Sequence, residues 1–207
     1  MQIIEMKLGL LRTNTYIVAG DESKDCIIID PAAEEQKIVD TLSENGLNLC
    51  AILLTHGHFD HIGVAENLRN RFGADIYAME EEKAILETSA NLSDMIRQNF
   101  ILKADVNMKD SDVINLAGCE FKVIHTPGHT IGSCCFYVEK EKVLFSGDTM
   151  FCDSYGRTDF PTGSASSIIH SITEKLLKLP DDTKVYPGHE ETTTIGYERH
   201  NYDYYQF

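Results

Sequence analysis

The segment Thr55-His56-Gly57-His58-Phe59-Asp60-His61 most constrains what this chain can fold into. It places three histidines and one aspartate within six positions, directly after the apolar run AILLT. A short apolar run that ends in polar residues is typical of a buried strand followed by a loop. Loops at the carboxyl ends of such strands hold ligands in α/β folds. The segment therefore predicts a functional site at one edge of a sheet.

The residue types in this segment favour metal binding. Neutral imidazoles and carboxylates are good ligands for zinc, manganese and iron. Three histidines this close would repel one another once protonated, whereas a metal ion requires their deprotonated forms. Alternation along the turn can direct His56 and His58 to one point and Asp60 and His61 to another. A solvated turn that holds histidines by chance does not explain this density.

Three further strand ends carry the same residue types. In FKVIHTPGHT, a Pro-Gly turn can deliver His129 to a site beside the sheet, while His125 falls within the strand pattern and is assigned a structural role. Asp148 follows a glycine that ends the run VLFSG, and His189 follows Pro-Gly in KVYPGHE. Together with the first segment, these positions predict a site with ligands from several loops.

The rest of the chain alternates short apolar runs with helical patterns. The expected strands are QIIEMKL, NTYIVAG, DCIIID, CAILLT, DIYAM, FKVIHT, CCFYVE, KVLFSGD and KVYPG. The expected helices span residues 34–45, 62–72, 80–88, 92–98 and 164–179. This order favours an α/β layered domain with helices outside the sheets. Because no linker or repeat interrupts the chain, residues 1–207 are expected to form one domain.

Charge and residue content exclude several classes of binding partner. The formal net charge is −15, with no cluster of Lys or Arg, which argues against nucleic acids and anionic membranes as partners. No run approaches the ~20 apolar residues of a membrane span, and the N-terminal segment lacks the apolar centre of a secretory signal. The six cysteines include no CxxC spacing, which disfavours cysteine-based zinc binding. We therefore expect a cytoplasmic protein that acts on a small molecule.

THGHFDH, with TPGHT, SGDT and PGHE downstream, resembles the metallo-β-lactamase superfamily over essentially the whole chain. The resemblance implies an α/β fold, an αββα four-layer sandwich of two mixed sheets with helices outside and a metal site at one edge. It also implies two divalent metal ions, most simply zinc, with iron or manganese as alternatives. The implied ligands are His56, His58 and His129 for one ion, Asp60, His61 and His189 for the other, and Asp148 between them.

Two more stretches are similar to one branch of that superfamily. GRTDF after SGDT and TTTIGYER after PGHE resemble the short, single-domain glyoxalase II-like (hydroxyacylglutathione hydrolase-like) proteins. The branch implies cleavage of a thioester such as S-lactoylglutathione to a 2-hydroxy acid and a thiol, by attack of a metal-bridging hydroxide. Asp60 is expected to be catalytic by orienting that hydroxide. No C-terminal helical domain of the kind that holds glutathione in full-length glyoxalase II is expected.

Two residues near these motifs are candidate substrate contacts. Arg157 can bind a substrate carboxylate, or it can pair with Asp159 and fix its own loop. Tyr197 belongs to a tyrosine-rich end of the chain that continues through residues 202–207. Amphipathic rings there can wall a substrate cleft, form a subunit contact or pack onto the domain.

Other activities stay open alongside thioester hydrolysis. The persulfide dioxygenases of the same superfamily share the histidine segment and GRTDF but use one iron, which His56, His129 and Asp148 would hold here as a facial triad. Cleavage of β-lactams would require export, and the acidic charge argues against RNA hydrolysis. A scaffold protein of this family that had lost its activity would lack at least one metal-binding residue, and this sequence lacks none of them. The sequence therefore favours the hydrolase over the dioxygenase.

Overall fold

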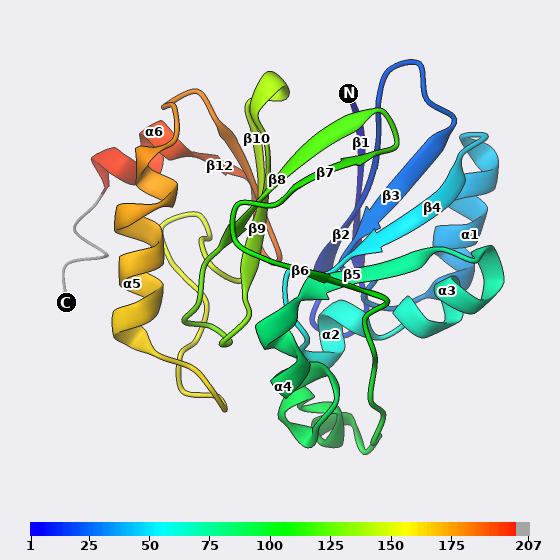
Figure 1. The fold of residues 1–207 in the computed structure, drawn as a ribbon, viewed down its shortest axis with the longest axis horizontal. Coiled ribbons are helices and arrows are strands. Elements are labelled where there is room, and N and C mark those ends of the chain that lie inside the picture. The colour runs from blue at the N-terminus through cyan, green and yellow to red at the C-terminus, as the bar shows by residue number, and fades with distance from the viewer. Residues whose placement is uncertain (202–207) are drawn as a thin grey trace.

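The computed structural model describes residues 1–201, so Tyr202, Tyr204, Tyr205 and Phe207 lie outside the described residues. The strands form two sheets that face each other (Figure 1). The first sheet has the order β1 (Gln2–Leu8), β2 (Thr13–Ala19), β3 (Asp25–Ile29), β4 (Asn48–Leu53), β5 (Asp75–Met79) and β6 (Val106–Met108). Its first three strands are antiparallel and β3 to β6 are parallel. It is thus a mixed sheet, as predicted.

The second sheet is also mixed. Its order is β12 (Thr193–Thr194), β11 (Lys184–Pro187), β10 (Val143–Gly147), β9 (Cys134–Val138), β8 (Cys119–His125) and β7 (Val113–Leu116). Strands β10 and β11 are parallel, and the other neighbours are antiparallel. The carboxyl ends of the parallel strands therefore supply an edge at which several loops meet.

Helices cover the outer face of each sheet. Figure 1 shows α1 (Glu35–Glu44) and α3 (Ala65–Phe72) beside the first sheet, and α5 (Ala165–Glu174) and α6 (Ile195–His200) beside the second. Two single-turn helices, α2 (Phe59–Ile62) and α4 (Lys83–Leu86), lie near the lower edge of the sheets in that view. Short 3₁₀ turns cover Glu80–Glu82, Ser89–Asn91, Ser93–Ile96, Glu139–Glu141 and Leu176–Lys178.

Three apolar layers separate the four layers of secondary structure. Ile38 of α1 and Ile52 of β4 belong to a cluster between the helices and the first sheet. Tyr16 and Phe145 belong to a cluster between the two sheets. Ile168 of α5 packs in a third cluster on the outer face of the second sheet. This arrangement confirms the predicted αββα sandwich.

The expected helix over residues 62–72 is confirmed from residue 65 to residue 72 but is interrupted at Gly63 and Val64. The structure has two helices, α2 and α3, with a break at Gly63 and Val64. The backbone N–H of Val64 donates to the carbonyl of Pro31, 3.1 Å away, instead of continuing a helical ladder. A Cβ on Gly63 would lie 2.2 Å from the carbonyl oxygen of Ala32, so only glycine fits where the chain passes this carbonyl. As a result, Asp60 and His61 lie in helix α2 and not in a loop before the helix.

Other differences concern short elements. The expected helix 92–98 is a single 3₁₀ turn, Ser93–Ile96, flanked by left-handed residues Leu92 and Arg97. The expected helix 164–179 ends as α5 at Glu174 and continues as a 3₁₀ turn. Strands β6, β7 and β12 were not predicted; each lies at a sheet edge and has two to four residues, too few for a clear period-two pattern.

Hydrogen bonds join the two sheets at the edge where the loops meet. The Tyr16 hydroxyl donates to the Pro187 carbonyl at 2.6 Å, and the Asn14 backbone N–H donates to the Gly188 carbonyl at 2.7 Å. The Cys134 N–H donates to the Thr55 carbonyl at 2.9 Å. These bonds connect the ends of β4 and β11, which carry predicted ligands, to strands of the facing sheet.

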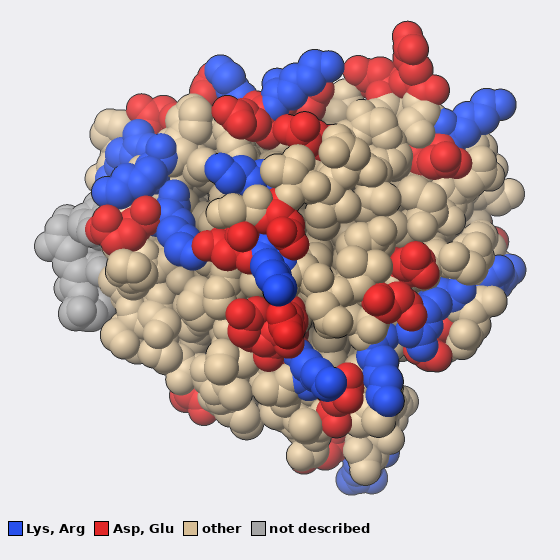
Figure 2. Space-filling view, in the orientation of Figure 1, with Lys and Arg blue, Asp and Glu red and all other residues tan. Residues whose placement is uncertain are grey.

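The surface is acidic but mixed in sign. On the face drawn in Figure 2, Lys and Arg lie between Asp and Glu side chains and do not form a continuous basic surface. Among residues 1–201, no helix is long and apolar enough to cross a bilayer.

Candidate metal centre

All the predicted metal ligands meet at one edge of the sandwich. Each lies just after a strand, where a buried run of apolar residues gives way to a polar loop or turn. These residues follow four strands: His56, His58, Asp60 and His61 after β4 (the last two in helix α2), His129 after β8, Asp148 after β10 and His189 after β11. His125, in contrast, lies within β8, and its Nε2 is 2.9 Å from the Ile131 carbonyl.

His56, His58 and His129 form the first group of donor atoms. One ring nitrogen of each lies within 4.8 Å of the other two. Nδ1 of His58 is 2.9 Å from Nε2 of His129. The Nδ1–H of His129 donates to the carbonyl of Arg157 at 2.7 Å, which leaves the lone pair on Nε2 facing the group. The three side chains are buried.

Asp60, His61 and His189 form the second group. Oδ2 of Asp60 is 3.3 Å from Nε2 of His189 and 3.5 Å from Nε2 of His61. The two histidine Nε2 atoms are 3.3 Å apart. The hydroxyl of Thr13 donates to Oδ2 of Asp60 at 3.1 Å and holds the carboxylate in place. Asp60 and His189 are only partly buried, so this group opens towards solvent.

Asp148 lies between the two groups. Its Oδ1 is 3.4 Å from Nε2 of His61, and its Oδ2 is 3.5 Å from Nε2 of His129. Gly188 makes this position possible, because a Cβ there would lie 2.3 Å from Oδ1 of Asp148 and 2.7 Å from the His61 ring. Asp148 therefore offers one oxygen to each group.

These donor atoms fit metal ions. Bonds of about 2.0–2.2 Å place tetrahedral ligands roughly 3.3–3.6 Å apart, close to the separations within the second group. Nε2 of His56 and Oδ1 of Asp148 are buried and have no hydrogen-bond partner within residues 1–201. A buried donor or acceptor without a partner is costly, and a cation at the centre of the cluster would satisfy both atoms. The residues present therefore suit two ions held side by side.

Burial controls protonation in the first group. It lowers the pKa of His56 well below the ordinary value, with the neighbouring His61 acting in the same direction. Burial, together with the adjacent His129, lowers the pKa of His58 to about 3. The pKa of His129 is also lowered by burial. All three imidazoles are therefore neutral at pH 7, as metal ligands must be.

Carboxylates control protonation in the second group. Burial alone would lower the pKa of His61, yet Asp148, Asp60 and Asp30 around it raise it to about 10. Burial alone would raise the pKa of Asp60, yet His61 and His189 hold it below its usual value. Asp60 is therefore ionised at pH 7.

Comparison with known proteins assigns the chain to a family. A profile described as the metallo-beta-lactamase superfamily matches residues 8–189. The chain belongs to this superfamily. It is 38% identical over 185 residues to the hydroxyacylglutathione hydrolase GloC of Haemophilus influenzae, with 86% of each chain covered.

Two solved structures of the superfamily fold match over nearly their full length. The BLEG-1 B3 metallo-beta-lactamase has a TM-score of 0.92 and 36% identity, with 100% of both chains covered. TTHA1623, solved in a di-iron-bound form, has a TM-score of 0.83 and 33% identity, with 96% of this chain and 98% of that chain covered. One structural neighbour of this chain thus holds two iron ions.

Asp30 is a buried residue of the site that sequence reasoning missed. Its Oδ2 is 2.9 Å from Nδ1 of His61, and the same carboxylate accepts from the backbone N–H and hydroxyl of Thr55 at 2.8 Å and 2.6 Å. A carboxylate behind a histidine fixes the ring orientation and keeps its other nitrogen available to a metal. The available signal was its place at the end of the apolar run CIIID.

Glu82 is a second such residue. It is buried and accepts from the N–H of Gly57 at 2.7 Å, the hydroxyl of Thr130 at 2.8 Å and the N–H of Gly132 at 2.8 Å. It therefore joins the loop of His56 and His58 to the loop of His129. Burial raises the pKa of Glu82 to about 7, against the effect of these hydrogen bonds. The triple glutamate 80–82 gave no sign of which member is buried.

A cleft of about 380 Å³ opens over the donor atoms. Arg157 lines it, with its guanidinium 4.2 Å from the Phe160 ring and bonded to both oxygens of Asp159 at 2.9 Å and 2.7 Å. Tyr197 does not line this cleft: its hydroxyl donates to Asp153 at 3.1 Å, beside a separate hollow. The structure thus brings Arg157 to the predicted site and places Tyr197 apart from it.

Proposed function

We propose that this protein is a binuclear, metal-dependent hydrolase of thioesters. The observation that carries the proposal is the pair of adjacent donor groups, with Asp148 offering one oxygen to each. The proposed ligands are His56, His58 and His129 for one ion, Asp60, His61 and His189 for the other, and Asp148 for both. Two divalent ions fit this set, with zinc the first candidate and iron or manganese the alternatives.

Two bound divalent ions would supply a nucleophile from water at neutral pH and polarise the thioester carbonyl. Asp60 is catalytic in this proposal, because its ionised carboxylate, held by Thr13, can accept a hydrogen bond from the attacking hydroxide and orient it. The site needs no strong general acid, since the thiol that leaves has a pKa near ~8.5 and departs as the thiolate.

The first substrate to test is S-lactoylglutathione, which would yield a 2-hydroxy acid and a thiol. Support comes from the 38% identity to a protein named hydroxyacylglutathione hydrolase. A small-molecule substrate also agrees with the acidic charge, which disfavours nucleic acid and membrane surfaces as partners. We expect the protein to act in the cytoplasm.

The experiment compares metal-loaded and chelator-treated protein in the hydrolysis of S-lactoylglutathione. We expect turnover by the loaded protein, loss on chelation and no turnover by Asp60→Ala with its fold intact. His170→Ala, an exposed histidine on α5, is the matched control and should hydrolyse as the native protein does. Near-native turnover by Asp60→Ala with metal retained would contradict the role of Asp60. One bound iron, no hydrolysis and oxygen uptake with glutathione persulfide would identify a dioxygenase instead.

A further inference from the structure

A second cavity adjoins the metal centre, and it has no role in the hydrolysis as proposed so far. We infer that this cavity binds the acyl group of the thioester, and that the preferred acyl group is an apolar alkyl chain longer than acetyl or lactoyl. The inference rests on the proposed thioester hydrolysis and specifies its substrate class.

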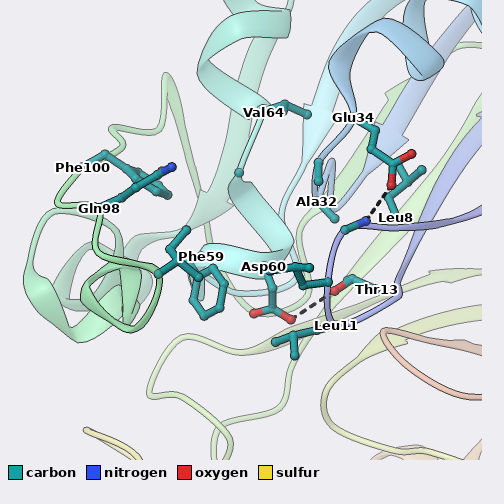
Figure 3. Close-up of a pocket in the computed structure, with 15 residues that line it drawn as sticks. Leu8, Leu11, Thr13, Ala32, Glu34, Phe59, Asp60, Val64, Gln98 and Phe100 are labelled. Atoms are coloured by element: carbon teal, nitrogen blue, oxygen red, sulfur yellow. Dashed lines mark hydrogen bonds between the residues drawn. The ribbon is translucent and has the colours of Figure 1, made fainter.

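The cavity has a volume of about 260 Å³ and a mainly apolar wall. Figure 3 shows Phe59, Leu11 and Ala32 around it, with Val64 above and Asp60 at its lower side. The turn between β1 and β2 forms one rim, and the segment 96–100 forms the opposite rim. A concave and mainly apolar wall with few polar groups is typical of a site for an apolar ligand.

Large apolar side chains stay exposed at the rim of this cavity. Leu10 is 93% exposed and Leu11 is 54% exposed, both on the turn after β1. Ile96, on the opposite rim, is also exposed. Exposed apolar side chains grouped around a hollow mark a binding surface, because burial against a ligand removes their apolar area from water.

The cavity is contiguous with the catalytic cleft. Leu11, Phe59 and Asp60 line both hollows. Asp60 also belongs to the second donor group, so a thioester whose carbonyl lies at the metal centre has the side cavity next to its acyl carbon. Leu11, one of the residues that the two hollows share, is an exposed leucine on the turn after β1.

Charges at the two hollows favour an uncharged substrate arm. Among the described residues that line them, Arg157 is the one Lys or Arg, and its guanidinium is bonded to Asp159. Glu34 adds negative charge at the side cavity and accepts from the N–H of Gly9 at 2.9 Å. A carboxylate-bearing arm would therefore meet no uncommitted Lys or Arg side chain among these lining residues. The side cavity therefore suits an alkyl chain, while a polar thiol carrier extends into solvent.

The size of the cavity sets the length of the chain. Pockets that hold a whole drug-sized ligand have about 300–1,000 Å³, so this cavity takes part of a substrate. Each methylene that enters an apolar site contributes about 0.8 kcal/mol, which equals roughly a four-fold change in kcat/KM. We expect kcat/KM to rise about four-fold per methylene from acetyl to butanoyl and hexanoyl, and then to level off.

The first experiment measures kcat/KM of the metal-loaded protein for acetyl, butanoyl, hexanoyl and lactoyl thioesters of N-acetylcysteamine, a neutral thiol. The inference predicts hexanoyl above butanoyl above acetyl, with lactoyl below butanoyl. A flat or falling series, or lactoyl as the best substrate, would overturn it. Repeating the series on glutathione separates the acyl preference from any preference for the carrier.

The second experiment fills the cavity with Val64→Phe. This substitution should lower the ratio of hexanoyl to acetyl turnover at least about ten-fold, whereas Ala165→Phe, at an exposed position of α5, should leave the ratio unchanged. An unchanged ratio in a folded Val64→Phe protein would contradict the assignment of the cavity.

A binding measurement on chelator-treated protein separates this inference from the proposed function. Addition of 1-hexanol should shift the methyl NMR signals of Leu8, Leu11 and Val64. In the Val64→Phe protein, the signals of Leu8 and Leu11 should no longer shift. Binding without any thioester hydrolysis would refute the proposed function and leave the cavity as an alkyl site. Hydrolysis without binding or chain-length preference would refute the inference alone.

Discussion

The two donor groups of the metal centre differ in chemistry although they share Asp148. The first consists of three buried imidazoles. The second contains the carboxylate of Asp60 and includes two partly buried members. Burial keeps the first group neutral, while carboxylates raise the pKa of His61 in the second. The first group is thus neutral and more deeply buried, and the second is charged and more open to the cleft that both groups line.

This difference in burial and charge favours different roles for the two groups. A buried group of neutral imidazoles is suited to holding an ion, since its donors are already in the deprotonated form that a metal requires. An open group with a carboxylate is suited to presenting water to a substrate, and Asp60 lies where the catalytic cleft and the apolar side cavity meet. Each group also has its own buried carboxylate behind it: Glu82 behind the first and Asp30 behind the second.

Removing the residue that joins the groups should have the largest effect. Asp148→Ala takes one oxygen from each group, so we expect a loss of at least about 1,000-fold in kcat and reduced occupancy of both metal positions. Elemental analysis and thioester turnover of the same preparation measure both. Asp182→Ala, an exposed aspartate near the start of β11, serves as the control. Retention of two ions by Asp148→Ala would show that it does not join the groups.

Disturbing the support of the second group should have a smaller effect. Asp30→Asn keeps the shape of the side chain but turns one of its acceptors into a donor, so Thr55 or His61 loses its bond. We expect metal affinity and turnover to fall about 10–100-fold, the usual cost of losing such a partner. Asp25→Asn, exposed at the start of the same strand, should change neither. Equal metal affinity in the two variants would refute the role of Asp30.

The support of the first group should be visible in the pH dependence of stability. The pKa of Glu82 is about 7 in the folded protein, above the ordinary value of 4.5. Between these values the folded state keeps a proton that the unfolded state has released, so stability falls as pH rises through this window. Glu82→Gln cannot titrate and should gain up to about 3 kcal/mol relative to the native protein between pH 4.5 and pH 8.

Denaturant unfolding of chelator-treated protein at several pH values tests this expectation. Glu81→Gln, the exposed neighbour, is the control and should not gain stability in this way. A stability difference between Glu82→Gln and the native protein that stays constant from pH 4.5 to pH 8 would contradict it.

The smallest effect is expected at Arg157. Its backbone carbonyl accepts from His129, while its side chain is bonded to Asp159 and exposed. Arg157→Ala keeps the carbonyl, so we expect kcat to change less than about three-fold. Steady-state kinetics with one thioester decides the point. A rise in KM of about ten-fold with kcat unchanged would instead make the guanidinium a substrate contact.

The comparison also shows what a sequence can predict here. The meeting of the candidate ligand residues at one place was predictable because each follows a buried apolar run, and strand ends gather at one edge of a sandwich. Asp30 and Glu82 were not, because their partners Thr55 and Thr130 lie 25 and 48 residues away, and no local pattern connects them. The break at Gly63 likewise depends on a carbonyl from a distant turn.

The central claim is that the two donor groups hold one ion each. Metal content per chain, measured in the native protein and in Asp60→Ala after loading with Zn²⁺ and removal of free ion, tests it most directly. The account predicts about two ions in the native protein and about one in Asp60→Ala, because the enclosed histidine group stays intact. One ion in both proteins would contradict it and would leave the open group without a metal.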